Sequence, residues 1–285
     1  MERKPIWICT LATQVCLFFA LYIALNLGHP QTSIYRAKNS NEFYFISVSG
    51  GFRPLLQQTL LLKTMENVAK SHKAKFVINT SELGEDDPLK QNATRFFPSL
   101  RVPWYSTRVS EEKEINCFQE KIKLPHGETL EIVGLDTGSL QETMLTRLSN
   151  GTCDNCLSSL TKTLEATDGQ WCMVVGFHPM VVCEANEEMK AKEIYEPLHH
   201  IFMKHGVNVY LSKHGCTKFA HQDSIAYIEN PDLVEYLDGR EMVDGFLLHG
   251  VSPIEIVTYF VTSAGEVVHR TLIRQRVTVC CHQSA

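Results

Sequence analysis

The chain has 285 residues, of which 44% are hydrophobic and 21% are charged, and this composition excludes an intrinsically disordered protein. The length is sufficient for the buried core of one large domain or two small ones. The formal net charge of -5 gives no excess of basic residues of the kind that attracts nucleic-acid phosphates, so we expect no nucleic acid among its partners.

The N-terminal segment predicts a membrane anchor. Residues 6–27 are 22 consecutive positions without a charge, and about 20 such residues cross a bilayer as a helix. Arg3 and Lys4, in the short end 1–5, favour a cytoplasmic location for that end. The pattern predicts a single-pass type II protein of the secretory pathway (ER/Golgi or cell surface), with its domain lumenal or extracellular. The alternative is secretion after signal cleavage, although the apolar run exceeds the roughly 7–15 residues usual for a signal peptide.

Cysteines and glycosylation sequons fit this location. Eight of the ten cysteines follow the predicted anchor, where an oxidising lumen permits disulfides, but their spacing does not give the pairing. Cys153 and Cys156 are expected to form a local disulfide or to remain as two free thiols. Asn92 and Asn150 begin sequons among polar, loop-like residues, and we expect glycans there. Asn79 begins a third sequon but ends an apolar strand, so we expect it to stay unmodified.

Alternating strands and helices follow a polar stalk over residues 28–41. Residues 43–48 predict a buried strand that ends in a turn, 55–70 have apolar residues at helical spacing, and 75–79 predict a second strand. Such a unit normally gives two parallel strands, and ligands gather beyond the carboxyl ends of those strands. We expect one domain over residues 42–285.

The same alternation continues toward the C-terminus. The apolar patterns predict strands over residues 129–135, 172–175 and 207–212 and a helix over residues 188–205. After Gly245, three further apolar segments suggest antiparallel strands, with a hairpin turn at residues 263–266.

A family resemblance rests on six strings: FVINTSELGEDD, PSLRVPWYSTRVSEE, LEIVGLDT, WCMVVGFHPM, HGVNVYLSKHGC and GEVVHR. In their order and rough spacing they resemble the purple acid phosphatases of the plant low-molecular-weight type, within the calcineurin-like metallophosphoesterase superfamily. The resemblance covers about residues 43 to 275. It implies an α/β (α+β) sandwich of two mixed β-sheets flanked by helices, with a dinuclear metal site in the loops that follow the strands.

Most of the metal ligands that the resemblance implies are replaced. His214 keeps a family histidine, Glu82 stands at the bridging aspartate and Cys216 at the last histidine, so we expect these three to be vestigial ligands. The degenerate ligand positions are Ser49, Glu85, Ser110 and Phe177. Because metal affinity depends on several correctly placed ligands, we expect no dinuclear site, no resident cofactor and no catalytic residue.

One alternative retains metal chemistry through a rebuilt site for a single divalent ion such as zinc. Its candidate donors are Glu82, Glu85, His178, His214 and Cys216. His178 follows the degenerate position Phe177, and neighbouring side chains of an extended backbone point in opposite directions. His178 therefore cannot simply replace the lost ligand, and the acidic residues are also typical of solvated loops.

Two functions remain. The first is a membrane-anchored, catalytically inactive phosphatase-like protein that acts as a binding or scaffold module. Its partner would be a lumenal protein or a ligand with a phosphate or glycan, and Lys213 and Arg108 could bind an anion without metal. The second is a metal-dependent phosphomonoesterase with altered or weak activity. The sequence has no G-x-S-x-G elbow, Walker-type loop or H-E-x-x-H helix that would support another hydrolase or nucleotide chemistry.

Overall fold

The chain divides into two units, Met1–Arg36 and Ala37–Ala285. The structure is a computed structural model. It describes residues 11, 13–19, 42–107, 117–125, 127–137, 152–182, 193–194, 196–213, 219–231 and 244–275.

The first unit contains a helical stretch over residues 13–19. Its described large apolar side chains are between 58% and 72% exposed: Leu11, Val15, Leu17, Phe18 and Phe19. Within the described residues, no helix is both long enough and apolar enough to cross a membrane. Most of the predicted anchor, residues 6–27, lies outside the described part, so the anchor stays a prediction.

The first sheet of the second unit has six strands in the order β14-β13-β12-β1-β2-β3. The strands are β1 (Phe43–Ser49), β2 (Val77–Thr80), β3 (Trp104–Ser106), β12 (Gly245–Val251), β13 (Glu255–Thr262) and β14 (Val267–Arg274). β1, β2 and β3 are parallel, whereas β12, β13 and β14 join them as antiparallel neighbours. Helix α2 (Leu55–His72) connects β1 to β2 as the sequence predicts, and α3 (Pro88–Phe96) lies between the short 3₁₀ helices η2 (Gly84–Asp86) and η3 (Pro98–Leu100).

The second sheet also has six strands, in the order β10-β11-β9-β6-β5-β4. The strands are β4 (Cys117–Lys123), β5 (Thr129–Leu135), β6 (Trp171–Gly176), β9 (Val209–Ser212), β10 (Phe219–Gln222) and β11 (Ile225–Glu229). Its four central strands are parallel and its two edge strands are antiparallel. The helices α5 (Thr152–Glu165) and α6 (Glu196–Lys204) and the small pair β7 (Val181–Val182) and β8 (Glu193–Ile194) complete the described elements.

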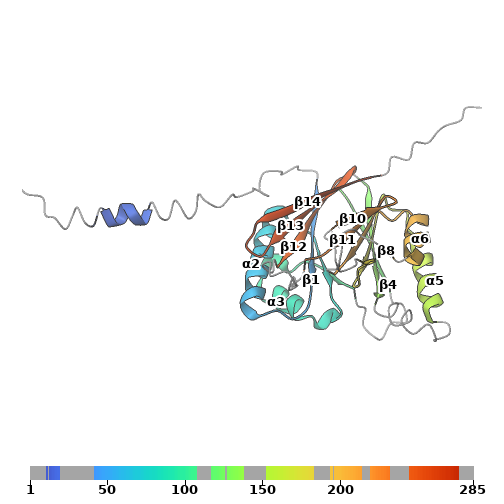
Figure 1. The fold of residues 1–285 in the computed structure, drawn as a ribbon, viewed down its shortest axis with the longest axis horizontal. Helices are drawn as coiled ribbons and strands as arrows, with labels where there is room; N and C mark the ends of the chain where they lie inside the picture. Colours follow the sequence, from blue (N-terminus) through green and yellow to red (C-terminus); the bar gives the residue numbers. More distant parts are fainter. Residues whose placement is uncertain are drawn as a thin grey trace, which may run out of the picture. The chain divides into compact units, whose positions relative to one another are not determined.

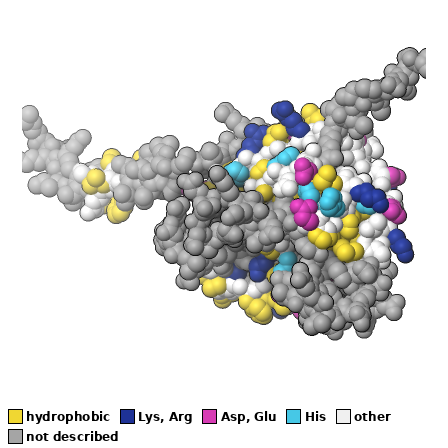
Figure 2. All heavy atoms as spheres, turned by 45° about the vertical axis from the view of Figure 1, so that its right-hand side comes forward, with side chains coloured by type: hydrophobic (Ala, Val, Ile, Leu, Met, Phe, Trp, Pro, Cys, Tyr) yellow, Lys and Arg dark blue, Asp and Glu magenta, His cyan; other side chains and the backbone are white. Residues whose placement is uncertain are grey.

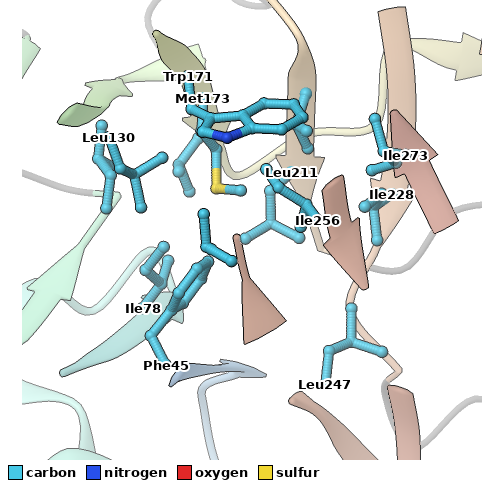
Figure 3. Packing of buried hydrophobic residues seen from close by; sticks show 14 of the residues in the cluster. Phe45, Ile78, Leu130, Trp171, Met173, Leu211, Ile228, Leu247, Ile256 and Ile273 are labelled. Carbon is cyan, nitrogen blue, oxygen red and sulfur yellow. The ribbon is translucent and has the colours of Figure 1, made fainter. Parts of the chain in front are cut away.

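The two sheets pack between two layers of helices. Figure 1 shows α2 and α3 on one side of the sandwich and α5 and α6 on the other. Side chains from both sheets meet in the main core, where Phe45 and Ile78 of the first sheet face Trp171 and Met173 of the second (Figure 3). A second core lies between the second sheet and its helices and includes Phe202. Burial on both faces explains why the central strands are apolar runs without alternation.

The predicted sandwich of two mixed sheets flanked by helices is confirmed. The structure corrects the helix predicted over residues 188–205, because α6 spans only Glu196–Lys204 and residues 193–194 form a strand. Residues 188–192 lie outside the described part of the chain. The sequence patterns missed the helices α3 and α5 and the strands β4, β7, β8, β10 and β11.

Candidate functional site

The candidate site lies where parallel strands of both sheets end. Two contacts bring these ends together: His178 Nε2, after β6, lies 4.0 Å from Glu82 Oε1, after β2, and Asn230 Nδ2, after β11, donates to Thr80 Oγ1 at 3.1 Å. We call the group Ser49, Glu82, Phe177, His178 and Lys213 the strand-end site. From the sequence, we expected ligands to bind at this edge, beyond the carboxyl ends of the parallel strands.

The turn after β1 is held by a carboxylate rather than arranged for a metal. Ser49 is fully buried, and its hydroxyl has no hydrogen-bond partner in the part of the chain that the structure describes. A Cβ atom at Gly50 would lie 2.2 Å from Asp87 Oδ2, so only glycine fits there. Asp87 Oδ2 accepts the Gly51 N–H at 2.9 Å, and Asp87 Oδ1 accepts the Leu89 N–H at 2.8 Å. One buried aspartate therefore fixes the turn and caps α3.

The two acidic candidates after β2 have different surroundings. The Glu82 side chain is 60% exposed and faces His178 across the sheets. The Glu85 side chain is 76% exposed and its carboxylate pairs with the Lys90 ammonium, which is one turn into α3. Glu85 therefore lies at the surface in an ion pair, and Glu82 is the acidic candidate that reaches the strand-end site.

The loop after β6 is fixed by three polar contacts. Thr137 Oγ1 accepts the N–H of Phe177 at 3.0 Å and that of His178 at 2.9 Å, and the Tyr210 hydroxyl donates to the His178 carbonyl at 2.7 Å. β6 ends at Gly176, and residues 177–178 form a bend. The expectation that Phe177 and His178 point in opposite directions assumed an extended backbone, and the bend removes that assumption. The His178 ring faces Glu82.

The His178 imidazole has a defined environment. Burial lowers its pKa, the Lys213 ammonium lowers it further, and the carboxylates of Glu82 and Asp136 raise it. The Thr137 hydroxyl accepts two backbone N–H groups, and its own proton can go to His178 Nδ1, which lies 3.0 Å away. The ring therefore lies between the Thr137 hydroxyl at Nδ1 and the Glu82 carboxylate on the side of Nε2.

Phe177 occupies a position where the resemblance implies a ligand histidine. Its phenyl ring has no lone pair, and the Lys213 Nζ atom lies 5.0 Å from the ring centroid. The Lys213 N–H also donates to the Phe177 carbonyl at 3.0 Å, which holds the two residues together. The arrangement is a cation–π contact in which a side chain of the protein supplies the positive charge.

The described donors do not fit a dinuclear metal centre. Ser49 has only a hydroxyl, and Phe177 has no lone pair to donate. The Glu85 carboxylate lies at the surface in an ion pair with Lys90. Among the described residues, no group of three histidine, cysteine, aspartate or glutamate side chains is arranged to hold a metal ion. The remaining candidates, Ser110, His214 and Cys216, lie outside the described residues, as does Arg108.

Beneath the strand ends, a buried polar network joins the two sheets. Ser47 Oγ donates to Asn230 Oδ1 at 2.6 Å and lies 2.7 Å from His249 Nε2, while His249 Nδ1 lies 2.9 Å from Thr258 Oγ1. Burial lowers the pKa of His249 to about 3, so the ring is neutral. The sequence analysis missed this network. The available signal was a histidine within the apolar strand that became β12.

The sequon asparagines lie in ordered elements where described. Asn92 lies within α3 rather than in the expected loop, and its Nδ2 atom, which would carry a glycan, donates to Gln58 Oε1 at 3.2 Å. Asn79 is fully buried in β2, which agrees with the expectation that it stays unmodified. Asn150 lies outside the described residues.

Comparisons with known proteins agree on the fold. No protein-family model and no curated protein sequence matches the chain. Among solved structures it is similar to GAP50, the anchor in the inner membrane complex of Plasmodium, with a TM-score of 0.62, 15% identity, and coverage of 82% of this chain and 89% of that chain. It is also similar to the purple acid phosphatase PPD1 from yellow lupin, with a TM-score of 0.49, 10% identity, and coverage of 83% and 54%. The similarity concerns the fold: two mixed sheets flanked by helices fit a metallophosphoesterase sandwich.

Proposed function

We propose that the chain is a membrane-anchored, catalytically inactive phosphatase-like protein that acts as a binding or scaffold module of the secretory pathway. The observation that supports this most directly is the Lys213 ammonium 5.0 Å from the Phe177 ring centroid. A lysine charge beside the ligand position of Phe177 opposes the binding of a divalent cation there, because like charges repel. The site keeps a positive charge but loses the Lewis acid that the family's chemistry needs.

Two further positions support the loss of activity. Ser49 is fully buried, and a neutral hydroxyl is a much weaker metal ligand than the carboxylate it replaces. Glu85 would have to leave its ion pair with Lys90 to reach a metal. We infer that the domain is of the plant low-molecular-weight purple acid phosphatase type by descent, with its frame kept and its metal chemistry lost.

A scaffold role agrees with two observations. GAP50, which has a similar fold, is described as an anchor in a membrane complex. The helical stretch over residues 13–19 presents large apolar side chains, which suits a segment inside a bilayer. The chain would be a type II protein whose domain binds a lumenal or extracellular protein, or a ligand with a phosphate or glycan.

The second candidate is a metal-dependent phosphomonoesterase with weak or altered activity and a single ion such as zinc. Glu82 and His178 favour it, because they converge within 4.0 Å from different sheets. It requires His214 and Cys216 to complete the donor set.

Metal content and turnover distinguish the two candidates. The full chain is purified in detergent from a secretory host, bound metals are measured by elemental analysis, and hydrolysis of p-nitrophenyl phosphate is assayed. We expect a folded protein without stoichiometric metal and without turnover. Stoichiometric metal together with turnover that His214→Ala abolishes would establish the second candidate and refute the first. Protease protection of the short N-terminal end in sealed microsomes tests the type II orientation.

A further inference from the structure

The start of α2 exposes large apolar side chains that the fold does not use. Phe52 is 84% exposed, Leu55 78% and Leu56 72%. Leu60, one turn after Leu56 on the same side of the helix, is 47% exposed, and Phe96 of α3 is 61% exposed. The Asn92–Gln58 hydrogen bond ties α3 to α2. We call Phe52, Leu55, Leu56, Leu60 and Phe96 the α2 face.

The opposite side of α2 already completes the core. Leu61, Leu62, Met65, Val68 and Ala69 are buried between the helix and the rest of the domain. The exposed leucines are therefore additional to a satisfied amphipathic helix. Contiguous apolar side chains of this size on a surface mark a contact with another apolar phase or with a partner.

Two lysines continue the helical stripe of Leu56 and Leu60. Lys63 and Lys70 are exposed on that stripe, whereas Lys73 and Lys75 follow the C-terminal end of α2. Glu66 is half-buried and accepts the Ser99 N–H at 3.3 Å, and the Arg95 guanidinium lies 5.2 Å from the Phe96 ring centroid. Acidic side chains occur at the start of α3, where Glu85 pairs with Lys90 and Asp86 is exposed.

The other helical side of the sandwich has a mixed surface. Figure 2 shows histidine, acidic, basic and apolar side chains together there. Among the described residues of that side, the side chains of Glu196, His200 and Asp223 are 66%, 78% and 54% exposed. The α2 face thus combines large exposed apolar side chains with Lys63 and Lys70 on the same helical stripe, and this combination binds anionic lipid surfaces.

We propose that the α2 face rests on the surface of an anionic bilayer, with Phe52, Leu55 and Leu56 inserted among the lipids. The inference rests on the membrane anchoring proposed above. Side chains more than 70% exposed stand clear of the surface instead of lining a groove, which suits insertion into a fluid phase. The lysines of α2 then lie near the headgroups.

The predicted stalk permits this contact. Residues 28–41 are 14 residues that span at most about 50 Å when extended. A domain of this size has a radius of gyration of about 18 Å, so a stalk of this length allows any face to reach the membrane. A short tether also raises the effective concentration of the domain at the bilayer, so weak insertion is enough to orient it.

Photocrosslinking to lipid tests the proposal. The full chain is reconstituted into nanodiscs of phosphatidylcholine and phosphatidylserine that contain a photoactivatable phosphatidylserine, and labelled peptides are mapped by mass spectrometry. We expect labelling of residues 52–60 as well as 6–27. The double variant Leu55→Ser, Leu56→Ser should lose the labelling at Phe52 and Leu60 without loss of folding, because both replaced side chains are exposed. The variant Lys63→Glu, Lys70→Glu should reduce it about tenfold.

Ile254→Ser is the matched control. Ile254 is 70% exposed, close to the value for Leu56, but it follows β12 at the edge where β1 begins, whereas Phe52 follows the end of β1. Its replacement should leave the labelling unchanged. Labelling confined to residues 6–27 would overturn the proposal and leave the anchor intact. Labelling of 52–60 without 6–27 would support the α2 face and refute the anchor. Self-association that the leucine variant abolishes, without lipid labelling, would assign the face to a second copy and overturn the bilayer contact.

Discussion

His178 Nε2 lies 4.0 Å from Glu82 Oε1, and this contact joins the loop after β6 in one sheet to the loop after β2 in the other. An imidazole and a carboxylate thus face each other across the two sheets. The protonation state of His178 should follow the charge on Glu82, because that carboxylate raises the His178 pKa.

Glu82→Gln should lower the pKa of His178 further. Burial already lowers this pKa and the Glu82 carboxylate opposes the effect, so removing the negative charge leaves burial and Lys213 to dominate. The measurement is the ¹³Cε1 shift of His178 against pH by NMR in the Ala37–Ala285 unit. Asp86→Asn, which replaces an exposed carboxylate on η2, is the control and should leave the titration unchanged. A rise in the pKa would contradict the assigned geometry.

Stability should fall as the pH falls, and His249 should account for much of the loss. The folded-state pKa of His249 is about 3, against an ordinary value of 6.5, so the unfolded chain binds a proton that the folded chain refuses. The free energy of unfolding therefore loses nothing to His249 above about pH 6.5, and it decreases through this residue as the pH falls toward 3. The shift corresponds to about 5 kcal/mol.

The measurement is urea unfolding of the Ala37–Ala285 unit at several pH values between those limits. His249→Phe should flatten the pH dependence while costing about 1–3 kcal/mol at neutral pH, because Ser47 and Thr258 each lose a partner. His200→Phe, at a side chain that is 78% exposed, serves as the control. An unchanged acid dependence in the His249 variant would show that other groups cause it.

Gly50→Ala should destabilise the domain by about 2–4 kcal/mol. The added methyl group would lie 2.2 Å from Asp87 Oδ2 and 2.4 Å from Asn79 Oδ1, both in buried side chains. Asp87→Asn keeps one acceptor oxygen but turns an NH2 group toward a backbone N–H that the lost oxygen accepted, so it should also destabilise the domain, by about 1–3 kcal/mol. Thermal unfolding of both variants measures the two losses. A tolerated alanine would mean that the turn after β1 is looser than the structure has it.

Phe177→His alone should not restore metal binding. The new imidazole would lie beside the Lys213 ammonium, and Ser49 and Glu85 would still be unsuited as ligands. Adding Lys213→Gly removes the local positive charge and should raise the zinc content above that of the single variant. Elemental analysis after dialysis against zinc measures both. Stoichiometric zinc in the single variant would show that the remaining donors are sufficient, and would favour the hydrolase.

The sequence predicted the fold well where a strand is buried on both faces. The predicted strand 129–135 coincides with β5, and residues 43–48 and 207–212 overlap β1 and β9, because uninterrupted apolar runs have few other solutions in a sandwich. The edge strands β4 and β10 of the second sheet were missed. β10 has side chains that are half-buried or exposed, so its sequence lacks the apolar signal.

The location of the site could be predicted from the sequence, but the contacts between its side chains could not. Spacing along the chain put Ser49 and Phe177 at strand ends, where the structure has them. The meeting of His178 with Glu82 depends on a bend after Gly176, which the pattern did not contain. The network of Ser47, His249 and Asn230 joins positions up to 202 residues apart, and local patterns do not encode such pairing.

The contact between Lys213 and Phe177 has a consequence for how the domain depends on its surroundings. Metallophosphatases take their central charge from solution, and a chelator can remove it. In this domain the charge near the loop after β6 is covalently part of the chain, and it cannot be extracted, exchanged for another ion or oxidised. The positive charge beside that loop is therefore in place as soon as the polypeptide folds.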